Sequence, residues 1–331
     1  MPAERSITIR SHHRSLRIVL VTPAPRGSRH GNRITARRWA RLLRELGHRV
    51  HIRVEWTGET CDLLVALHAW KSLPSIRRHH DSHPERPLVV ALTGTDLYRD
   101  IDAHAGAREG LAWASRLVVL HDRAARALPV ALRGKTEVIF QSTPPQVSAA
   151  PHLRRHFDVC VLAHLRPVKD PFRATLASRH LPAASRVRIL QVGGALTAGM
   201  ETRARRETAR NRRYRWLGNV PRGRALHLLA RSQLLVNSSR TEGGANAVSE
   251  AVVCGVPVLA SHIPGNLGLL GGRYPGTYPV GDTKRLAALI EKAETDSAFL
   301  ERLGAACTVR RPLFTPARER ASWQRLLAGL G

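Results

Sequence analysis

Short apolar runs recur along almost the whole chain, and between them lie longer stretches whose apolar residues return every three or four positions. Such runs are typical of parallel strands buried on both faces, and the longer period is that of amphipathic helices. This alternation restricts the chain to α/β folds, because each parallel connection needs a helix-length crossover. The predicted strands are residues 16–21, 50–54, 62–67, 87–92, 116–120, 135–140, 157–163, 186–192, 214–218, 233–239 and 257–261.

A segment containing Pro and Ser interrupts the alternation near the middle of the chain, at residues 141–151. The chain has 331 residues, which is enough for two domains with a core each. We therefore predict two doubly wound, Rossmann-like domains that face each other across a cleft. The predicted organisation is a loose tail (1–14), a first domain (15–143), a linker (144–152), a second domain (153–312) and a C-terminal helix packed through Trp323 (313–331).

The net charge of +28 raises the question of nucleic-acid binding. However, the arginines are spread along the whole chain, and four Tyr and five Phe are too few for base-stacking platforms. The four cysteines are scattered, no apolar run is long enough to span a membrane, and the N-terminus lacks the apolar core of a secretory signal. These features predict a cytoplasmic protein with no nucleic-acid partner and no stable membrane insertion.

The most informative segment is 239–250, which joins a buried strand to a helix. Its small residues let backbone N–H groups approach a ligand, and the helix N-terminus favours negative charge, a combination that suits a diphosphate. Glu242 and Glu250 are separated by seven residues, so Glu250 lies two helical turns further on and is placed to accept hydrogen bonds from a ribose. An ordinary Gly-containing strand-to-helix turn is the alternative.

The flanks of this segment resemble the signature of glycosyltransferase family 4, because Glu250-Ala251 is followed by Gly255, Pro257 and Val258 at the family's spacing. The resemblance implies the GT-B fold and a UDP-sugar donor. It implies that Glu250 holds the ribose and that Glu242 contacts the sugar or supports a developing positive charge. It also implies that the diphosphate or sugar is surrounded by Gly243, Gly244, Ala245, Asn246 and Ala247.

Residues 163–171 resemble a second family segment, in which Lys169 matches the lysine that binds the diphosphate. The family arginine falls on His164, and we expect Arg166 to supply the lost positive charge. Positive side chains and a helix terminus stabilise a leaving diphosphate without a metal. We therefore expect no metal and no cofactor, and we attribute the Asp100-Ile101-Asp102 sequence to a helix start.

Three loops of the first half, 22–36, 66–72 and 91–101, follow strands at the sheet edge where ligands bind. They are similar to the selenosugar synthases of selenoneine biosynthesis. The resemblance implies selenophosphate as acceptor, UDP-N-acetylglucosamine or UDP-glucose as donor, and a 1-selenosugar as product. The matching residues are Pro25, Gly31-Asn32-Arg33, Thr35-Ala36, Arg38-Trp39, Ala66-Leu67-His68-Ala69 and Thr93-Gly94-Thr95-Asp96-Leu97-Tyr98-Arg99-Asp100.

Thiol-pathway relatives have a histidine where this chain has Thr93, before Gly94-Thr95-Asp96. A hydroxyl acceptor benefits from proton removal, whereas selenophosphate is already an anionic nucleophile. Together with Glu242, the catalytic candidates are Asp96 and His68, and the sequence leaves open which residue, if any, assists phosphate loss. The candidate acceptor-binding residues are Gly31, Asn32, Arg33, Thr93 and Thr95, and Arg26, Arg29 and Lys71 are further cations in these loops.

Three alternatives stay open on the sequence. The first is a conventional GT-B transferase with a hydroxyl or thiol acceptor, which shares the donor site and differs in the first-half loops. The second is an epimerase or hydrolase on the same scaffold, which consumes the donor without an acceptor. The third is a basic nucleotide- or polyanion-binding protein without turnover.

Overall fold

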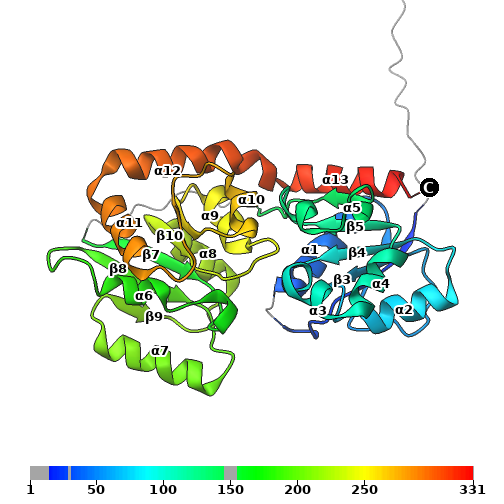
Figure 1. The fold of residues 1–331 in the computed structure, drawn as a ribbon, viewed down its shortest axis with the longest axis horizontal. Helices are drawn as coiled ribbons and strands as arrows, with labels where there is room; N and C mark the ends of the chain where they lie inside the picture. The colour runs from blue at the N-terminus through cyan, green and yellow to red at the C-terminus, as the bar shows by residue number, and fades with distance from the viewer. Residues whose placement is uncertain (1–14, 29–30, 145–154, 331) are drawn as a thin grey trace, which may run out of the picture.

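The computed structural model describes residues 15–28, 31–144 and 155–330. The predicted tail and all but the first residue of the predicted linker lie outside the described residues. The described chain forms two α/β domains, each built on a parallel sheet of six strands with helices on its faces (Figure 1). No helix of the described part of the chain is long and apolar enough to cross a membrane.

The first sheet has the strand order β2-β1-β3-β4-β5-β6, and every pairing in it is parallel. All side chains of β3 and β4 are buried, which explains why these strands read as continuous apolar runs. The strands are β1 (Arg17–Val21), β2 (Arg49–Arg53), β3 (Leu63–Leu67), β4 (Leu88–Leu92), β5 (Arg116–Val119) and β6 (Thr136–Val138).

The helices of the first domain follow the apolar period of the sequence. In α1 the residues Ala36, Trp39 and Leu43 are buried against the sheet, and the chain leaves the helix through Gly47 at a φ of 92°. The elements are α1 (Gly31–Glu45), α2 (Leu73–Ser82), the π-helical turn η1 (Asp96–Asp100), α3 (Ile101–Ala103), α4 (Ala105–Trp113), η2 (Ala124–Ala127) and α5 (Val130–Arg133).

The second sheet has the order β12-β11-β10-β7-β8-β9 and is also parallel throughout. Its strands match the predicted ones, except that β12 has two residues and was too short to give a sequence signal. They are β7 (Phe157–Leu162), β8 (Val187–Val192), β9 (Tyr214–Trp216), β10 (Leu234–Asn237), β11 (Val258–Ser261) and β12 (Thr277–Tyr278).

Helices cover the second sheet and continue along one side of the molecule (Figure 1). The predicted helix after residue 245 is α9, and it ends at Gly255 in the left-handed conformation. The elements are η3 (Pro167–Lys169), α6 (Arg173–Ser178), α7 (Ala198–Arg210), α8 (Arg222–Ala230), α9 (Asn246–Cys254), α10 (Pro264–Leu270), α11 (Thr283–Thr295), α12 (Ser297–Arg310) and η4 (Arg311–Phe314).

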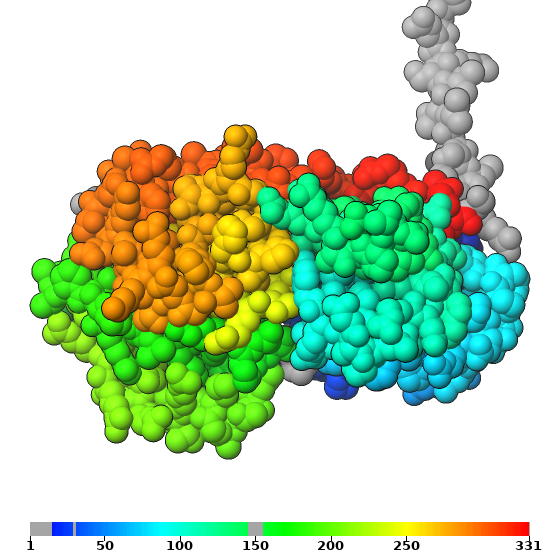
Figure 2. Space-filling view, viewed as in Figure 1, coloured from blue at the N-terminus to red at the C-terminus, as the bar shows by residue number. Residues whose placement is uncertain are grey.

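The last helix, α13 (Pro316–Ala328), leaves the second domain and packs on the first (Figure 1). Trp323 meets Trp39 edge to face, with ring centroids 4.9 Å apart, and Glu319 accepts a 2.7 Å hydrogen bond from Trp39 Nε1. In the space-filling view the C-terminal segment bridges the two domains along one edge, and the domains also touch below it (Figure 2). The predicted packing role of this helix is confirmed, and its partner is the first domain.

Candidate active site

Two loops of the second domain meet at the carboxyl edge of the sheet, because they follow the neighbouring strands β7 and β10. The loop after β7 contains residues 163–171, and the loop after β10 leads into α9. Arg240 N–H donates to Val168 O at 2.8 Å, and Ser238 Oγ donates to Asp170 O at 2.8 Å. The two segments singled out in the sequence therefore form one side of a single site.

Lys169 and Glu242 are in direct contact in this site. Lys169 Nζ donates a hydrogen bond to Glu242 Oε1, and Ser239 Oγ donates to the same oxygen at 2.6 Å. Glu242 is buried and Lys169 is half-buried. The ammonium group has three protons, so the pair leaves Lys169 with donors for an anionic ligand.

Glu250 is buried on α9 and lies 2.6 Å from Arg222 Nη2. Burial raises the pKa of the Glu250 carboxyl above its ordinary value, and the nearby charges of Arg222 and Arg38 lower it. Asn246 precedes Glu250 by four residues, so both lie on one face of α9. A carboxylate and the open N-terminus of the helix are therefore presented side by side.

Arg166 and His164 flank the same loop. Arg166 is half-buried, and its Nε is buried without a hydrogen-bond partner among the described residues. His164 Nδ1 accepts the Gly194 N–H at 3.1 Å. That Arg166 provides the positive charge missing at position 164 stays a prediction.

The small residues of the donor loop meet the first domain. A Cβ added at Gly243 would lie 2.4 Å from Gly94 N, and one added at Gly244 would lie 2.8 Å from Leu120 Cβ. Ala245 is the N-cap residue of α9, and Ala247 is half-buried in its first turn. The predicted donor loop and the predicted acceptor loop 91–101 are thus in contact across the domain boundary.

Asp96 is fully buried and organises the acceptor-side loops. It accepts hydrogen bonds from Thr93 N–H at 3.0 Å, Gly94 N–H at 2.7 Å and Ala69 N–H at 3.2 Å. These bonds join the loops after β3 and β4. The geometry favours a positioning role for Asp96 over the predicted catalytic one.

His68 is also buried, and both of its ring nitrogens have protein partners. Nδ1 accepts the Lys71 N–H at 3.3 Å, so the neutral ring has its proton on Nε2, which is 3.1 Å from Thr95 Oγ1. Asp100 Oδ2 is 3.6 Å from the same Nε2. Burial lowers the pKa of His68, which favours this neutral form, while Asp96 acts in the opposite direction.

The remaining acceptor candidates lie in the first turn of α1 and in the loop after β4. Gly31 is exposed at the start of α1, and Asn32 and Arg33 follow it, half-buried. Thr93 and Thr95 are half-buried in the loop after β4. Arg29 lies outside the described residues.

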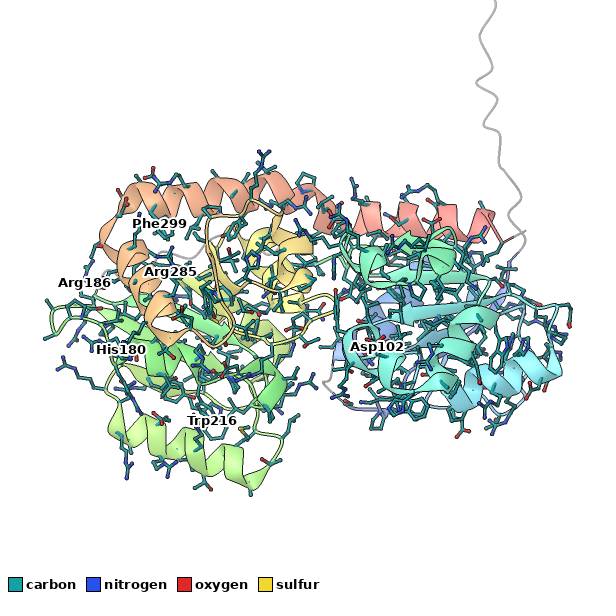
Figure 3. The ribbon with its side chains drawn as sticks, viewed as in Figure 1. Asp102, His180, Arg186, Trp216, Arg285 and Phe299 are labelled. Atoms are coloured by element: carbon teal, nitrogen blue, oxygen red, sulfur yellow. The ribbon has the colours of Figure 1, made fainter. Side chains whose placement is uncertain are left out.

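The two aspartates of the Asp100-Ile101-Asp102 sequence have different environments. Asp100 is buried beside His68, whereas Asp102 is exposed on the first domain (Figure 3). The turn at which they lie joins η1 to α3. The expected helix start is therefore confirmed, and Asp100 is an unexpected neighbour of His68.

Arg38 and Arg222 were not among the predicted site residues. Arg38 was named only among the residues that carry the resemblance, without a role, and Arg222 has no local signal in an arginine-rich chain. Arg222 reaches Glu250 from α8, and Arg38 reaches Asn246 from α1. Only the packing of helices distant in sequence brings them to the site.

Comparison with known proteins agrees with this geometry. Residues 150–308 match the family model of glycosyl transferases group 1. HepE (Alr3699) of Anabaena, solved in complex with UDP and glucose, has a TM-score of 0.75 at 16% identity, covering 95% of this chain and 100% of that chain. A sucrose-phosphate synthase from Thermosynechococcus elongatus has a TM-score of 0.75 at 15% identity, with 96% and 99% covered. A glycosyltransferase from Rickettsia africae has a TM-score of 0.70 at 12% identity, again with 96% and 99% covered. No curated protein matches this chain.

The fold and the two facing domains define this chain as a GT-B protein. More particularly, the part of the chain that matches the glycosyl transferases group 1 family model is its second domain, which contains Lys169, Glu242 and Glu250.

Proposed function

We propose that this protein is a glycosyltransferase that transfers a sugar from UDP-N-acetylglucosamine, or UDP-glucose, to selenophosphate and forms a 1-selenosugar for selenoneine biosynthesis. The observation that carries the acceptor assignment is the state of the two candidate bases. The side-chain polar atoms of His68 and Asp96 are hydrogen-bonded to other groups of the protein.

The donor half of the proposal is supported by the second domain. A UDP-sugar needs a partner for its ribose and positive charge for its diphosphate. The second domain contains Glu250, Lys169 and the N-terminus of α9, which we assign to these two roles. The family match over residues 150–308 and the UDP and glucose bound to HepE point to the same class of donor.

The acceptor half is supported by the absence of an available base at His68 and Asp96. A hydroxyl acceptor gains about 10²–10⁴ in rate from a positioned base, whereas an ionised selenium nucleophile does not need one. Thr95 accepts from His68, so its own hydroxyl proton is left to donate to an anionic oxygen. Arg33 in the first turn of α1 and Lys71 in the loop after β3 add positive charge for a phosphate-containing acceptor.

The reaction is a displacement at the anomeric carbon. The selenium lone pair of selenophosphate attacks C1, the bond from C1 to the diphosphate oxygen breaks, and UDP leaves with that electron pair. Lys169 and the N-terminus of α9 stabilise the charge on the leaving UDP. One water then cleaves the Se–P bond, which releases inorganic phosphate and the selenosugar.

The test is mass spectrometry of a reaction with freshly generated selenophosphate and each UDP-sugar, while UDP release is followed in parallel. We expect a selenium-containing sugar that requires the enzyme and both substrates. The variant Glu250→Ala serves as the control, because loss of the ribose contact removes turnover.

Other outcomes separate the alternatives. UDP release without selenium in the product indicates hydrolysis or a hydroxyl or thiol acceptor, and a panel of such acceptors then identifies the class. Binding of random polyanions without release of UDP from any UDP-sugar contradicts the proposal and supports a basic binding protein.

A further inference from the structure

Arg38 is a residue of the first domain whose side chain reaches the second. It lies on α1, is 8% exposed, and donates a 2.9 Å hydrogen bond from Nη2 to Asn246 Oδ1. Asn246 is the first residue of α9, where the predicted diphosphate site lies. A guanidinium from one domain is therefore fixed at the N-terminus of a helix in the other.

The second terminal nitrogen of Arg38 is unused. Nη1 is buried and has no hydrogen-bond partner among the described residues. A buried donor without a partner destabilises the folded protein, and more so when the group is charged. A ligand bound at this site would accept a hydrogen bond from Nη1, which would account for the missing protein partner.

The nearby carboxylates do not accept a hydrogen bond from Arg38 Nη1. Glu319 receives hydrogen bonds from Trp39 and the Ser142 N–H, and Glu250 pairs with Arg222. Burial lowers the pKa of Arg38, and the charges of Glu319 and Glu250 act in the opposite direction. These charges help to keep a cation at the domain boundary without occupying Nη1.

The position of the guanidinium indicates which part of a ligand it meets. Asn246 and Glu250 lie one helical turn apart on the same face of α9. Arg38 is hydrogen-bonded to Asn246 at the helix N-terminus, and its charge acts on Glu250, the carboxylate expected to hold the ribose. The first N–H groups of a helix have no intrahelical acceptor and favour an anion. An anion at this point receives the backbone donors and Nη1 together.

We propose that Arg38 is a donor-binding residue that the first domain contributes, and that its Nη1 binds an anionic oxygen of the nucleotide diphosphate. The inference rests on the proposed use of a UDP-sugar and deepens it. It makes the diphosphate site bipartite, with Lys169 and α9 on one side and Arg38 on the other. Donor binding then depends on contact between the domains.

The test is calorimetric binding of uridine, UMP and UDP to the wild-type protein, Arg38→Gln and Arg38→Lys. A charge-assisted contact to phosphate predicts a loss of UDP affinity of about 10- to 100-fold in Arg38→Gln, with uridine affinity unchanged within about twofold. Arg38→Lys keeps the charge but loses the planar set of guanidinium donors. We therefore expect its UDP affinity to lie between those of the wild-type protein and Arg38→Gln. Arg37→Gln, at the exposed neighbouring position, is the matched control and leaves all three affinities unchanged.

The ligand series distinguishes this role from a structural one. Equal losses for uridine and UDP mean that Arg38 only supports the domain contact, and unchanged UDP affinity in both variants overturns the proposal directly. Should Arg38→Gln unfold, as its thermal midpoint would reveal, Arg38→Lys carries the test. If wild-type protein binds uridine and UDP equally weakly, the proposed donor fails, which is distinct from a failure confined to Arg38.

Discussion

His68 has a backbone conformation that few side chains adopt. Its φ is 76°, in the left-handed region, directly after β3. Such a conformation costs of order 1–3 kcal/mol and persists where surrounding contacts fix it. Here Ser72 N–H donates to His68 O at 3.0 Å, and His68 N–H donates to Ala91 O at 2.8 Å. The ring is thereby held on Thr95, which is the arrangement of a positioning residue.

The variant His68→Asn tests this role at the residue scale. Asn tolerates a positive φ, so the turn is expected to persist. If His68 positions Thr95 and removes no proton, kcat/KM with selenophosphate falls by less than about tenfold, whereas loss of a general base costs about 10²–10⁴. The measurement is kcat/KM across pH for both proteins. A loss in the larger range, with disappearance of the acidic limb that protonation of His68 would produce in the pH profile, assigns His68 as the base.

At the scale of elements, the domain boundary is formed by second-domain glycines packed against first-domain loops. Gly243 faces the Thr93–Gly94 backbone, and Gly268 of α10 faces His121 after β5. An added Cβ at Gly268 would lie 2.2 Å from His121 Nδ1. The absence of side chains at these points permits the close approach of the two domains.

Gly268→Ala is expected to separate the domains without unfolding either. Ala is a better helix former than Gly by about 1 kcal/mol, so α10 itself is not weakened. We expect a larger radius of gyration in small-angle X-ray scattering and a lower kcat/KM, with the thermal midpoint retained. Gly199→Ala, in an exposed position of α7 with no neighbouring atoms within 4 Å, is the matched control. Full activity in Gly268→Ala would show that this contact is dispensable.

The helix α2 contains a buried titratable group that contributes to acid sensitivity. His79 packs edge to face on Trp56, and neither ring nitrogen has a hydrogen-bond partner among the described residues. Burial lowers the pKa of His79 from 6.5 to about 4. The unfolded chain therefore binds the proton more readily than the folded protein. The contribution of His79 to the free energy of unfolding is fully present above pH 6.5 and declines as the pH falls toward 4.

His79→Leu is expected to remove this contribution. The variant loses no hydrogen bond, so its free energy of unfolding near neutral pH equals or exceeds that of the wild type. Between neutral pH and about pH 5 it should lose less stability than the wild type, by on the order of 1–2 kcal/mol. Urea unfolding at the two pH values measures the difference. Identical acid losses in both proteins would contradict a role for His79.

At the scale of the whole molecule, α13 connects the end of the chain to its beginning. Glu319 is buried and accepts from Trp39 Nε1 at 2.7 Å and from the Ser142 N–H at 2.8 Å. Trp323 and Leu326 pack in the same core as α1. The first domain therefore includes a helix that the chain makes only after completing the second.

Glu319→Ala leaves these two buried donors without an acceptor. Each costs roughly 1–3 kcal/mol, so we expect the free energy of unfolding to fall by about 2–4 kcal/mol, measured by urea denaturation. Glu301→Ala, at an exposed position of α12, is the control and changes stability by less than about 0.5 kcal/mol. A comparably small change in Glu319→Ala would mean that α13 is held by its apolar contacts alone.

The sequence by itself determined the elements and the donor motif. Continuous apolar runs marked the strands because both faces of a parallel sheet are buried. The predicted C-terminal helix is α13, and in the structure the Thr315 side chain caps its start. Glu242 and Glu250 were predicted from their spacing and Lys169 from the family resemblance, and the structure brings Lys169 and Glu242 into contact.

Only the tertiary structure decided which partners these elements meet. Arg38 and Asn246 are 208 positions apart, and Trp39 and Glu319 are 280 apart. The same is true of the partners that occupy His68 and Asp96, which depend on how the loops after β3 and β4 pack. Local patterns report whether a side chain is buried, but the identity of its neighbour is set by how the helices and domains close on one another.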